Sequence, residues 1–388
     1  MPTSIYLDNN ATTRPLPEVL DAMNEHWRAS FANPGSHHGL GRTARKALED
    51  SREKIASILE ADPSEVIFTS GGTESTNLAI QGFAQAMSPG AILLTEGEHL
   101  ASMECCRTLE RERGFRLECL QVDSHGMLKP EQLSEFADSD LRMATVILAH
   151  NETGVIQDLQ RISEFCRERG IPLHVDAVQA VGKIPVSFAG LACTAMSLAA
   201  HKFHGPRGIG ALLLRRGTTL PPLLRGGHQE SEHRPGTEPV ALAVGMATAL
   251  ECWHRDQSQR TRLMRERRDE LQAGLLETCP NAVVNAMGAN RLPNTLNISF
   301  PGIDAEALLV NFDLAGICCS LGSTCASGST LPNQTLVAMG LPEEVYRSAI
   351  RFSVSFETTA EEIATAVQRV SQIVERMQRS AESIKLHS

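Results

Sequence analysis

The chain has 388 residues, of which 42% are hydrophobic and 21% are charged, and its formal net charge is -10. This is ordinary globular composition, which argues against long disordered tracts, and the length suggests two or three domains. The acidic balance argues against a protein that coats nucleic acid, because neutralising phosphates requires a basic surface.

Short apolar runs alternate with helix-length segments through the first two thirds of the chain. The runs expected to form buried strands are residues 66–69, 91–94, 117–120, 144–148, 171–175, 195–198 and 210–214. The clearest helix is predicted over 43–59, whose apolar residues fall on one stripe. This alternation predicts an α/β fold with a mostly parallel sheet. Ligands of such sheets bind beyond the carboxyl ends of the strands, so the polar residues that follow each run are the candidates for a site.

The pattern changes at about residue 251. A charged helix is predicted over 254–276, followed by strands over 295–300, 317–320 and 351–356 and a C-terminal helix over 359–377. We therefore expect a large α/β domain over residues 15–255 and a smaller α+β domain over 256–388. An N-terminal arm, residues 1–14, is expected to pack near the smaller domain.

The N-terminus and the cysteines indicate where the protein resides. Residues 1–10 lack the basic start and apolar run of a secretory signal, and the apolar stretch 239–250 is too short to cross a bilayer. Ten cysteines are scattered along the chain, with vicinal pairs at Cys105-Cys106 and Cys318-Cys319. Because no export signal is visible, we interpret these cysteines as reduced thiols in the cytoplasm rather than as disulfides.

A glycine-rich turn follows the first strand of the large domain. Residues 70–75 read Ser-Gly-Gly-Thr-Glu-Ser and precede a predicted helix, so Gly72 leaves backbone N–H groups open and Thr73 adds a hydroxyl. Open N–H groups at the start of a helix form a cradle for a phosphate. An ordinary capped helix is the other interpretation.

Two charged residues stand at the ends of later strands. Asp176 ends the run 171–175, where a buried carboxylate is costly unless it has a partner. It is either a cap of the next segment or the partner of a protonated pyridine nitrogen. Lys202 follows the run 195–198 and precedes a glycine-rich turn. Most lysines are solvated surface residues, but a lysine at a strand mouth could have its pKa lowered and form a Schiff base.

Two more polar residues follow strands of the same predicted sheet, His99 and Asn151. Each alone is more often structural. Polar residues at five strand ends, with complementary chemistry, are difficult to explain as five separate structural residues. A phosphate cradle, a partner for a pyridine nitrogen and a Schiff-base lysine together describe pyridoxal phosphate.

The chain is similar over nearly its whole length to the group I, NifS/IscS-like cysteine desulfurases, which are pyridoxal-phosphate enzymes of the aspartate-aminotransferase (type I) fold. The motifs that carry the resemblance are residues 6–13, 69–75, 150–154, 174–179, 201–208 and 351–353. The most specific is the loop Ser320-Leu321-Gly322-Ser323-Thr324-Cys325. Its Ser-x-Gly-Ser-x-Cys form resembles group I rather than the Arg-x-Gly-His-x-Cys form of group II.

The resemblance implies a cofactor site made from these motifs. Lys202 would carry pyridoxal phosphate as a Schiff base, and His99 would stack on its ring and assist proton transfers. Asp176 would pair with the ring nitrogen. The remaining contacts, to ring substituents and phosphate, would come from Gly72, Thr73, Asn151, Gln179 and His201.

The resemblance also implies the substrate, the sulfur carrier and the partners. Arg351 and Asn151 would bind L-cysteine, with Arg351 on the carboxylate. Cys325 would take the sulfur as a persulfide, leaving L-alanine, and pass it to an acceptor protein such as an iron–sulfur scaffold. Thr237 would reach the phosphate of the other subunit, which implies a homodimer. No nucleic acid, membrane or metal is expected.

Three residues depart from the family pattern. Ala199 stands where members commonly have a phosphate-binding serine, His228 replaces a glycine and Leu321 replaces a small residue. The contact that a hydroxyl at position 199 would make is then left to water or to a neighbour such as His204, which lies in the same turn.

Two other functions are considered. A selenocysteine lyase would use the same cofactor and differ in its preferred substrate. A non-catalytic iron–sulfur scaffold would use Cys318, Cys319 and Cys325, but that spacing lacks a CxxC and a fourth nearby ligand.

Overall fold

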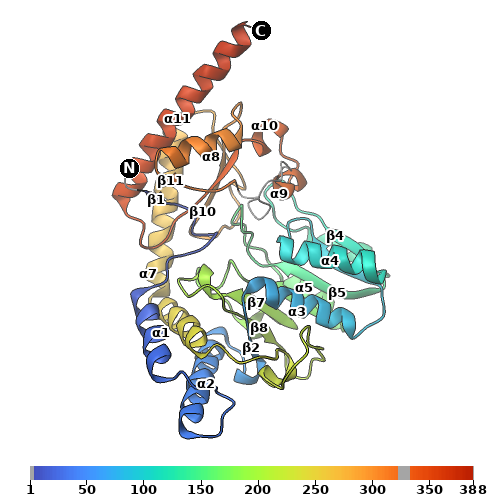
Figure 1. Cartoon of the computed structure of the whole chain (residues 1–388). Helices are drawn as coiled ribbons and strands as arrows, with labels where there is room; N and C mark the ends of the chain where they lie inside the picture. Colours follow the sequence, from blue (N-terminus) through green and yellow to red (C-terminus); the bar gives the residue numbers. More distant parts are fainter. Residues whose placement is uncertain (1–3, 322–332, 388) are drawn as a thin grey trace.

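The main sheet has seven strands in the spatial order β2-β8-β7-β6-β5-β3-β4 (Figure 1). The structure is a computed structural model that describes residues 4–321 and 333–387. The strands are β2 (Val66–Thr69), β3 (Ala91–Thr95), β4 (Arg116–Leu120), β5 (Leu141–Ile147), β6 (Leu173–Asp176), β7 (Ala195–Ala199) and β8 (Gly210–Leu214). Only β8 runs antiparallel to its neighbours, β2 and β7. The α/β class and the mostly parallel sheet are confirmed, although β5 begins three residues earlier than predicted.

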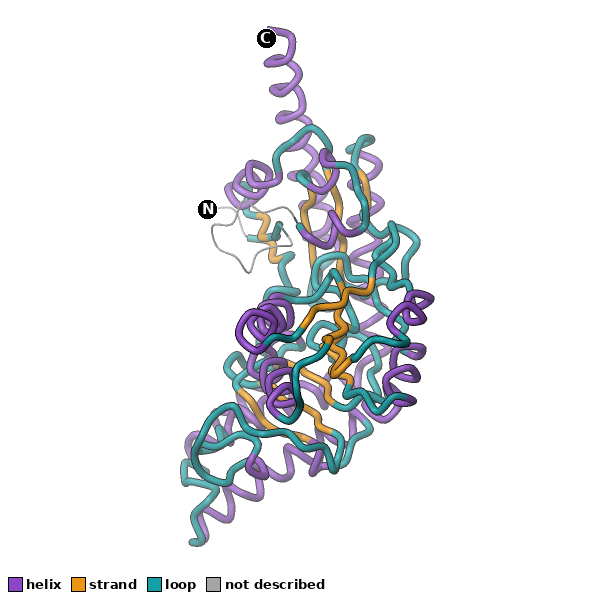
Figure 2. Tube along the Cα trace, turned by 90° about the vertical axis from the view of Figure 1, so that its right-hand side faces the viewer, coloured by secondary structure: helices purple, strands orange, loops and turns teal. Residues whose placement is uncertain are grey.

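Helices cover both faces of this sheet, as Figure 2 shows. Because side chains alternate along a strand, Ile67 of β2 packs on one face with Leu78 and Phe83. Its neighbour Phe68 packs on the other face with Leu48. Burial on both faces explains why these strands read as continuous apolar runs. The covering helices are α3 (Gly72–Gln85) and α4 (Leu100–Arg113) on the first face, and α1 (Pro17–Ala29), α2 (Gly39–Leu59), α5 (Gln160–Glu168) and α7 (Val240–Thr278) on the second.

A second group of elements forms the smaller part of the molecule. Its strands are the antiparallel set β12 (Ala349–Ser353), β10 (Thr295–Ser299) and β9 (Val283–Val284), and the parallel pair β1 (Ile5–Tyr6) and β11 (Ile317–Cys318). Its helices are α8 (Ala305–Leu314) and α11 (Ala360–His387), whereas α9 (Gln334–Ala338) and α10 (Glu343–Tyr346) contact the core of the large sheet through Leu336 and Tyr346. The last strand ends at Ser353 rather than at the predicted residue 356, because its pairing with β10 stops at Thr295. Arg351 therefore lies within a strand, not at its start.

The helix α7 is continuous over 39 residues, although its sequence changes from apolar to charged. Trp253 still packs in the core of the large sheet, whereas Met264, three turns further on, packs in the core of the smaller part. Figure 1 shows the helix running from one part into the other. We propose that the expected boundary between residues 255 and 256 lies within this helix. No helix among the described residues is long and apolar enough to cross a membrane.

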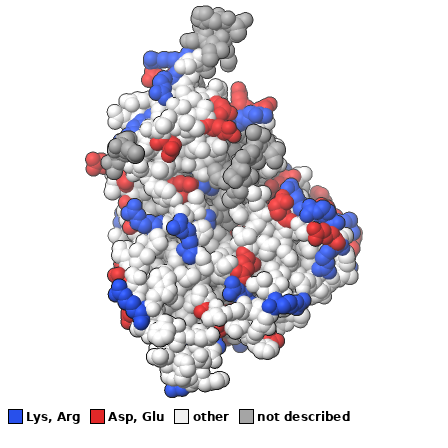
Figure 3. All heavy atoms as spheres, viewed as in Figure 1, with Lys and Arg blue, Asp and Glu red and all other residues white. Residues whose placement is uncertain are grey.

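The N-terminal arm crosses between the two parts. Ile5 and Leu7 are buried in the core of the smaller part, and the chain then passes the carboxyl ends of the large-sheet strands. The remaining short helices are η1 (Pro63–Glu65), η2 (Pro130–Phe136), α6 (Phe188–Leu191), η3 (Ala200–Lys202) and η4 (Glu230–Glu232). On the face shown in Figure 3, acidic and basic side chains of the described residues are interspersed.

Candidate active site

Lys202 lies in the short helix η3, directly after β7, as the strand-mouth interpretation requires. Its Nζ donates hydrogen bonds to the backbone carbonyls of Asn10, at 2.7 Å, and Ala11, at 2.9 Å. Both carbonyls belong to the N-terminal arm. The lysine is therefore held at the sheet edge rather than solvated at the surface.

Asp176 is the last residue of β6 and is 5% exposed. Its Oδ1 accepts a hydrogen bond from the N–H of Val178 at 3.0 Å. Asp176 therefore caps the turn that follows β6, and this role does not exclude a ring nitrogen as a second partner. Burial raises the pKa of Asp176, whereas the nearby His99 and Lys202 lower it. The carboxylate thus lies within electrostatic reach of both residues, and a cationic ring nitrogen would be a further partner of opposite charge.

His99 is the N-cap of α4, and its Nδ1 accepts a hydrogen bond from the N–H of Ala101 at 3.1 Å. Because Nδ1 is an acceptor, the neutral ring carries its proton on Nε2. The preceding Glu98 fixes this turn, since its Oε1 accepts from the Thr95 hydroxyl at 2.8 Å and from the N–H of Ile147 at 2.9 Å. Burial raises the pKa of Glu98 to about 8. Glu98 was not recognised from the sequence.

The predicted phosphate cradle is the start of α3. The N-cap Gly71 has no side chain to accept from the first N–H groups, so the usual capped-helix interpretation does not hold. A Cβ added to Gly72 would lie 2.8 Å from Cγ2 of Val178 and 3.6 Å from Cβ of Ala199. The open N–H groups therefore lie against the ends of β6 and β7, beside Asp176 and Lys202. A phosphate-bearing cofactor that is bound to Lys202 fits this arrangement.

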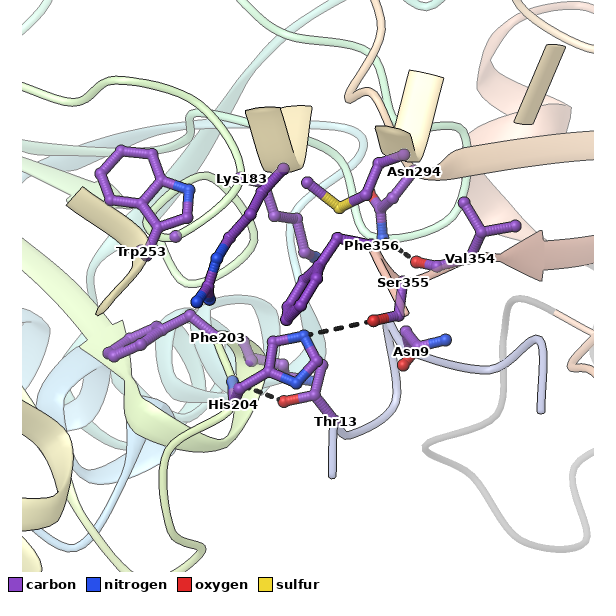
Figure 4. Close-up of a pocket in the computed structure, with 14 residues that line it drawn as sticks. Asn9, Thr13, Lys183, Phe203, His204, Trp253, Asn294, Val354, Ser355 and Phe356 are labelled. Carbon is purple, nitrogen blue, oxygen red and sulfur yellow. Dashed lines mark hydrogen bonds between the residues drawn. The ribbon is translucent and has the colours of Figure 1, made fainter. Parts of the chain in front are cut away.

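The two histidines of the turn after β7 face the N-terminal arm. His201 Nδ1 is 3.2 Å from the hydroxyl of Thr12, and burial lowers the pKa of His201 to about 4. The Nδ1 of His204 forms a hydrogen bond with the carbonyl of Arg14 at 2.8 Å. Its Nε2 forms one with the hydroxyl of Ser355 at 3.4 Å (Figure 4). Both ring nitrogens of His204 thus have partners in this structure, and its contact with the phosphate stays a prediction.

Asn10 connects the arm, the large sheet and the smaller part. It is 1% exposed, and its backbone carbonyl accepts from Lys202 and, at 3.0 Å, from Nε2 of Gln179. Its side-chain amide bonds to residues of both parts, namely the carbonyl of Asn151, the hydroxyl of Thr295, Nζ of Lys183 and Nδ2 of Asn294. The motif 6–13 contributed to the family resemblance, but it did not predict a role for Asn10. The available sequence signal was the polar pair Asn9-Asn10, which stands between the first strand and the pair Thr12-Thr13.

Arg351 lies in β12 and is 2% exposed. Its Nη2 pairs with Oδ1 of Asp8 at 2.8 Å, and its Nη1 donates to the backbone carbonyl of Asn151 at 3.0 Å. Its Nε is buried without a hydrogen-bond partner among the described residues. The structure therefore brings Arg351 to the turn that holds Asn151, and one donor remains for an anionic group.

Thr237 is a predicted site residue that the structure leaves outside this cluster. Thr237 is exposed, in a segment where Gly236 N–H donates to Oε1 of Gln229 at 3.0 Å. Cys325 lies outside the described residues. The chain leads toward it from Ser320, which exchanges two backbone hydrogen bonds with Arg351. The described cysteines are all free thiols, in agreement with the reduced state expected.

Comparison with known proteins identifies the family. Residues 5–365 match the family described as "Aminotransferase class-V". The chain is 39% identical to "Cysteine desulfurase IscS" of Dictyoglomus turgidum, over 97% of this chain and 96% of that protein. It is also 39% identical to "Cysteine desulfurase NifS" of Azotobacter vinelandii, over 96% of this chain and 93% of that protein.

Solved structures agree with these relatives. A "NIFS-LIKE PROTEIN" superposes with a TM-score of 0.90 at 35% identity, covering 96% of this chain and 100% of that one. A NifS-like protein from Rickettsia africae gives a TM-score of 0.86 at 31% identity, covering 96% and 99%. The chain therefore belongs to the class-V aminotransferase family and, within it, to the NifS/IscS-like cysteine desulfurases.

Proposed function

We propose that this protein uses pyridoxal phosphate, held on Lys202, to remove sulfur from L-cysteine, giving L-alanine and a persulfide on Cys325. The observation that carries the proposal is the grouping of Asp176, His99 and Lys202 at the carboxyl edge of the sheet, beside the open start of α3. When bound, the cofactor supplies an electron-withdrawing ring. Asp176 would hold the positive ring nitrogen, and the N–H groups at Gly72 and Thr73 would hold the phosphate together with His201.

The protein's own groups would handle the proton and the substrate. Lys202, displaced by the substrate amine, would take the proton from the substrate Cα, and its two carbonyl partners in the arm would receive the resulting ammonium. His99 would stack on the ring and donate from Nε2. Arg351, whose Nε has no hydrogen-bond partner among the described residues, would bind the substrate carboxylate through charge-assisted hydrogen bonds.

The sulfur transfer is assigned to Cys325 because its loop begins at Ser320, against Arg351. A thiol must be ionised to attack, and positive charge nearby favours the thiolate. Attack of the Cys325 thiolate on the substrate sulfur breaks the carbon–sulfur bond and forms the sulfur–sulfur bond. The electron pair of the broken bond remains on the substrate carbon, which is protonated and leaves as alanine.

The partners follow from the same proposal. The exposed Thr237 would complete the phosphate site of a second copy, which makes the active protein a homodimer. The persulfide would pass to an acceptor protein, such as an iron–sulfur scaffold, in the cytoplasm. Asn151 and Gln179 would contact the ring substituents, and Asn151 the substrate.

The test is a spectrum followed by a product assay. Protein incubated with pyridoxal phosphate and freed of excess should absorb visible light, and borohydride reduction should fix the cofactor to the peptide that contains Lys202. L-cysteine should then yield equal amounts of alanine and sulfide in the presence of a thiol reductant. Faster turnover of L-selenocysteine would point to a lyase, and a colourless protein that makes no alanine would reject the proposal.

A further inference from the structure

Lys183 is a buried amine that the proposed reaction does not use. It lies at the end of the turn that follows β6 and is 3% exposed. Its Nζ donates to Oδ1 of Asn10, at 2.9 Å, and to Oε1 of Gln179. Figure 4 shows Lys183 at the wall of a small cavity that Lys202 also lines. That cavity has a volume of about 10 Å³, which leaves room for little more than one water.

Among the residues that the structure describes, no acidic group compensates a charge on Lys183. The titratable and charged groups that face it from the surrounding elements are Lys202, His201, His204, Arg260 and Arg351. Burial lowers the pKa of Lys183 well below its ordinary value, and the charges of Lys202 and Arg351 lower it further. A neutral amine has two N–H donors, and among the described residues Lys183 has two acceptors, so an uncharged Lys183 is fully satisfied.

The partners of Lys183 determine which way two other side chains face. Gln179 is 5% exposed, and its Oε1 is occupied by Lys183 while one N–H of Nε2 donates to the carbonyl of Asn10. Among the described residues, the second N–H of this amide has no hydrogen-bond partner. The same Asn10 carbonyl accepts from Lys202. Lys183, Gln179 and Asn10 thus form a closed hydrogen-bonded triangle, one corner of which holds the proposed catalytic amine.

We propose that Lys183 is a positioning residue that locks the amide of Gln179 so that its N–H, not its carbonyl oxygen, faces the oxygen substituent of the pyridoxal ring. This inference rests on the proposed function. Without an N–H donor at position 183, the amide could rotate and present Oε1 to an electron-rich oxygen, which is repulsive. A donor at the ring oxygen stabilises the form of the bound cofactor that has lost its proton. Loss of the lock should therefore raise the pH at which the visible band changes.

The experiment compares pH titrations of the visible band in holoenzymes that carry Lys183→Met, Gln179→Ala and both changes. Lys183→Met keeps an unbranched side chain that is one atom shorter and removes both donors. We expect its midpoint to rise by about one pH unit, the size that one hydrogen bond can produce. If Lys183 acts through Gln179, its replacement should have no further effect in the Gln179→Ala background. Lys46→Met, at an exposed site, should leave the midpoint unchanged.

The outcomes separate this inference from the proposed function. A midpoint that stays unchanged in Lys183→Met, or that rises equally in the Gln179→Ala background, overturns the positioning role while the enzyme remains a desulfurase. A wild-type protein without a visible band rejects the proposed function instead. If Lys183→Met does not fold, a crystal structure of the wild-type holoenzyme decides. Lys183 Nζ must then contact Gln179 with Nε2 toward the ring oxygen, and a separation beyond hydrogen-bond distance overturns the role.

Discussion

Arg52 donates two parallel hydrogen bonds to the carboxylate of Glu230, from Nη1 to Oε2 at 2.9 Å and from Nη2 to Oε1 at 2.8 Å. The N–H of Phe68 adds a third bond to this carboxylate at 2.8 Å. Glu230 opens three consecutive non-glycine residues at positive φ, 48°, 52° and 71°, in the segment that leads to Thr237. The buried ion pair therefore holds a conformation that these residues rarely adopt.

The first prediction follows from this pair. Arg52→Ala leaves a buried carboxylate without its cation, which should lower the free energy of unfolding by about 3–5 kcal/mol. Urea denaturation followed by circular dichroism measures the change, with the exposed Lys46→Ala on the same helix as the control. A loss no larger than that of the control would show that the segment does not depend on Arg52.

The second prediction concerns Cys325. Cys325→Ala should keep the bound cofactor and its visible spectrum, because the cofactor contacts come from other residues, but should abolish sulfide release from L-cysteine. Cys119→Ala, an exposed cysteine on β4, is the matched control and should turn over normally. Sulfide production near the wild-type rate in the Cys325 variant would contradict the assigned sulfur transfer.

The third prediction concerns Asp176. Asp176→Asn removes the charge with little change of shape, so the cofactor should still bind while the electron-withdrawing form of the ring is lost. Turnover should fall severely, because the lost interaction acts on the transition state rather than on binding. Alanine formation by the reconstituted holoenzyme is the measurement. An unchanged kcat would remove Asp176 from this role.

The fourth prediction uses Ala199, whose Cβ lies beside Gly72 at the start of α3. His204 bonds to Arg14 and Ser355 in this structure, so a hydroxyl at position 199 would add a contact to the phosphate. Ala199→Ser should slow cofactor loss by up to about 10-fold, the equivalent of ~1.4 kcal/mol. Dialysis against a competing carbonyl reagent measures the remaining visible band, with Ala86→Ser at the far end of α3 as the control. Equal or faster loss from the Ala199 variant would mean that another group fills the position.

The fifth prediction is a pH dependence of stability. Burial raises the pKa of Glu98 to about 8, above its unfolded value near 4.5. Between these values the folded protein binds a proton that the unfolded chain has released, so stability from Glu98 falls as the pH rises from 4.5 to 8. Glu98→Gln should reduce the loss of stability between pH 6 and pH 9 in urea denaturation. Parallel pH profiles for the variant and the wild type would exclude the shift.

The strands of the large sheet and most of the proposed cofactor-binding residues could be predicted from the sequence. Apolar runs mark buried strands, and ligand-binding residues of such sheets follow the strand ends. Lys202, Asp176 and His99 were predicted on that basis. The network around Asn10 was not, because Asn10 and Lys183 are 173 positions apart and only the fold brings them together. The continuity of α7 was also missed. Its two halves face different cores, so their compositions differ although the backbone does not break.

That uninterrupted helix also limits how the protein can move. Residues 254–263 contain neither proline nor glycine, the residues at which long helices usually kink. The large sheet holds Lys202 and the smaller part holds Arg351, and both pack on this one rigid helix. Domain closure by hinging within α7 is therefore disfavoured. The distance between Lys202, where the substrate amine is proposed to react, and Arg351, which is proposed to bind the substrate carboxylate, is then determined by the fold. Adjustment to the substrate would come from side chains and from the segments that join the two parts.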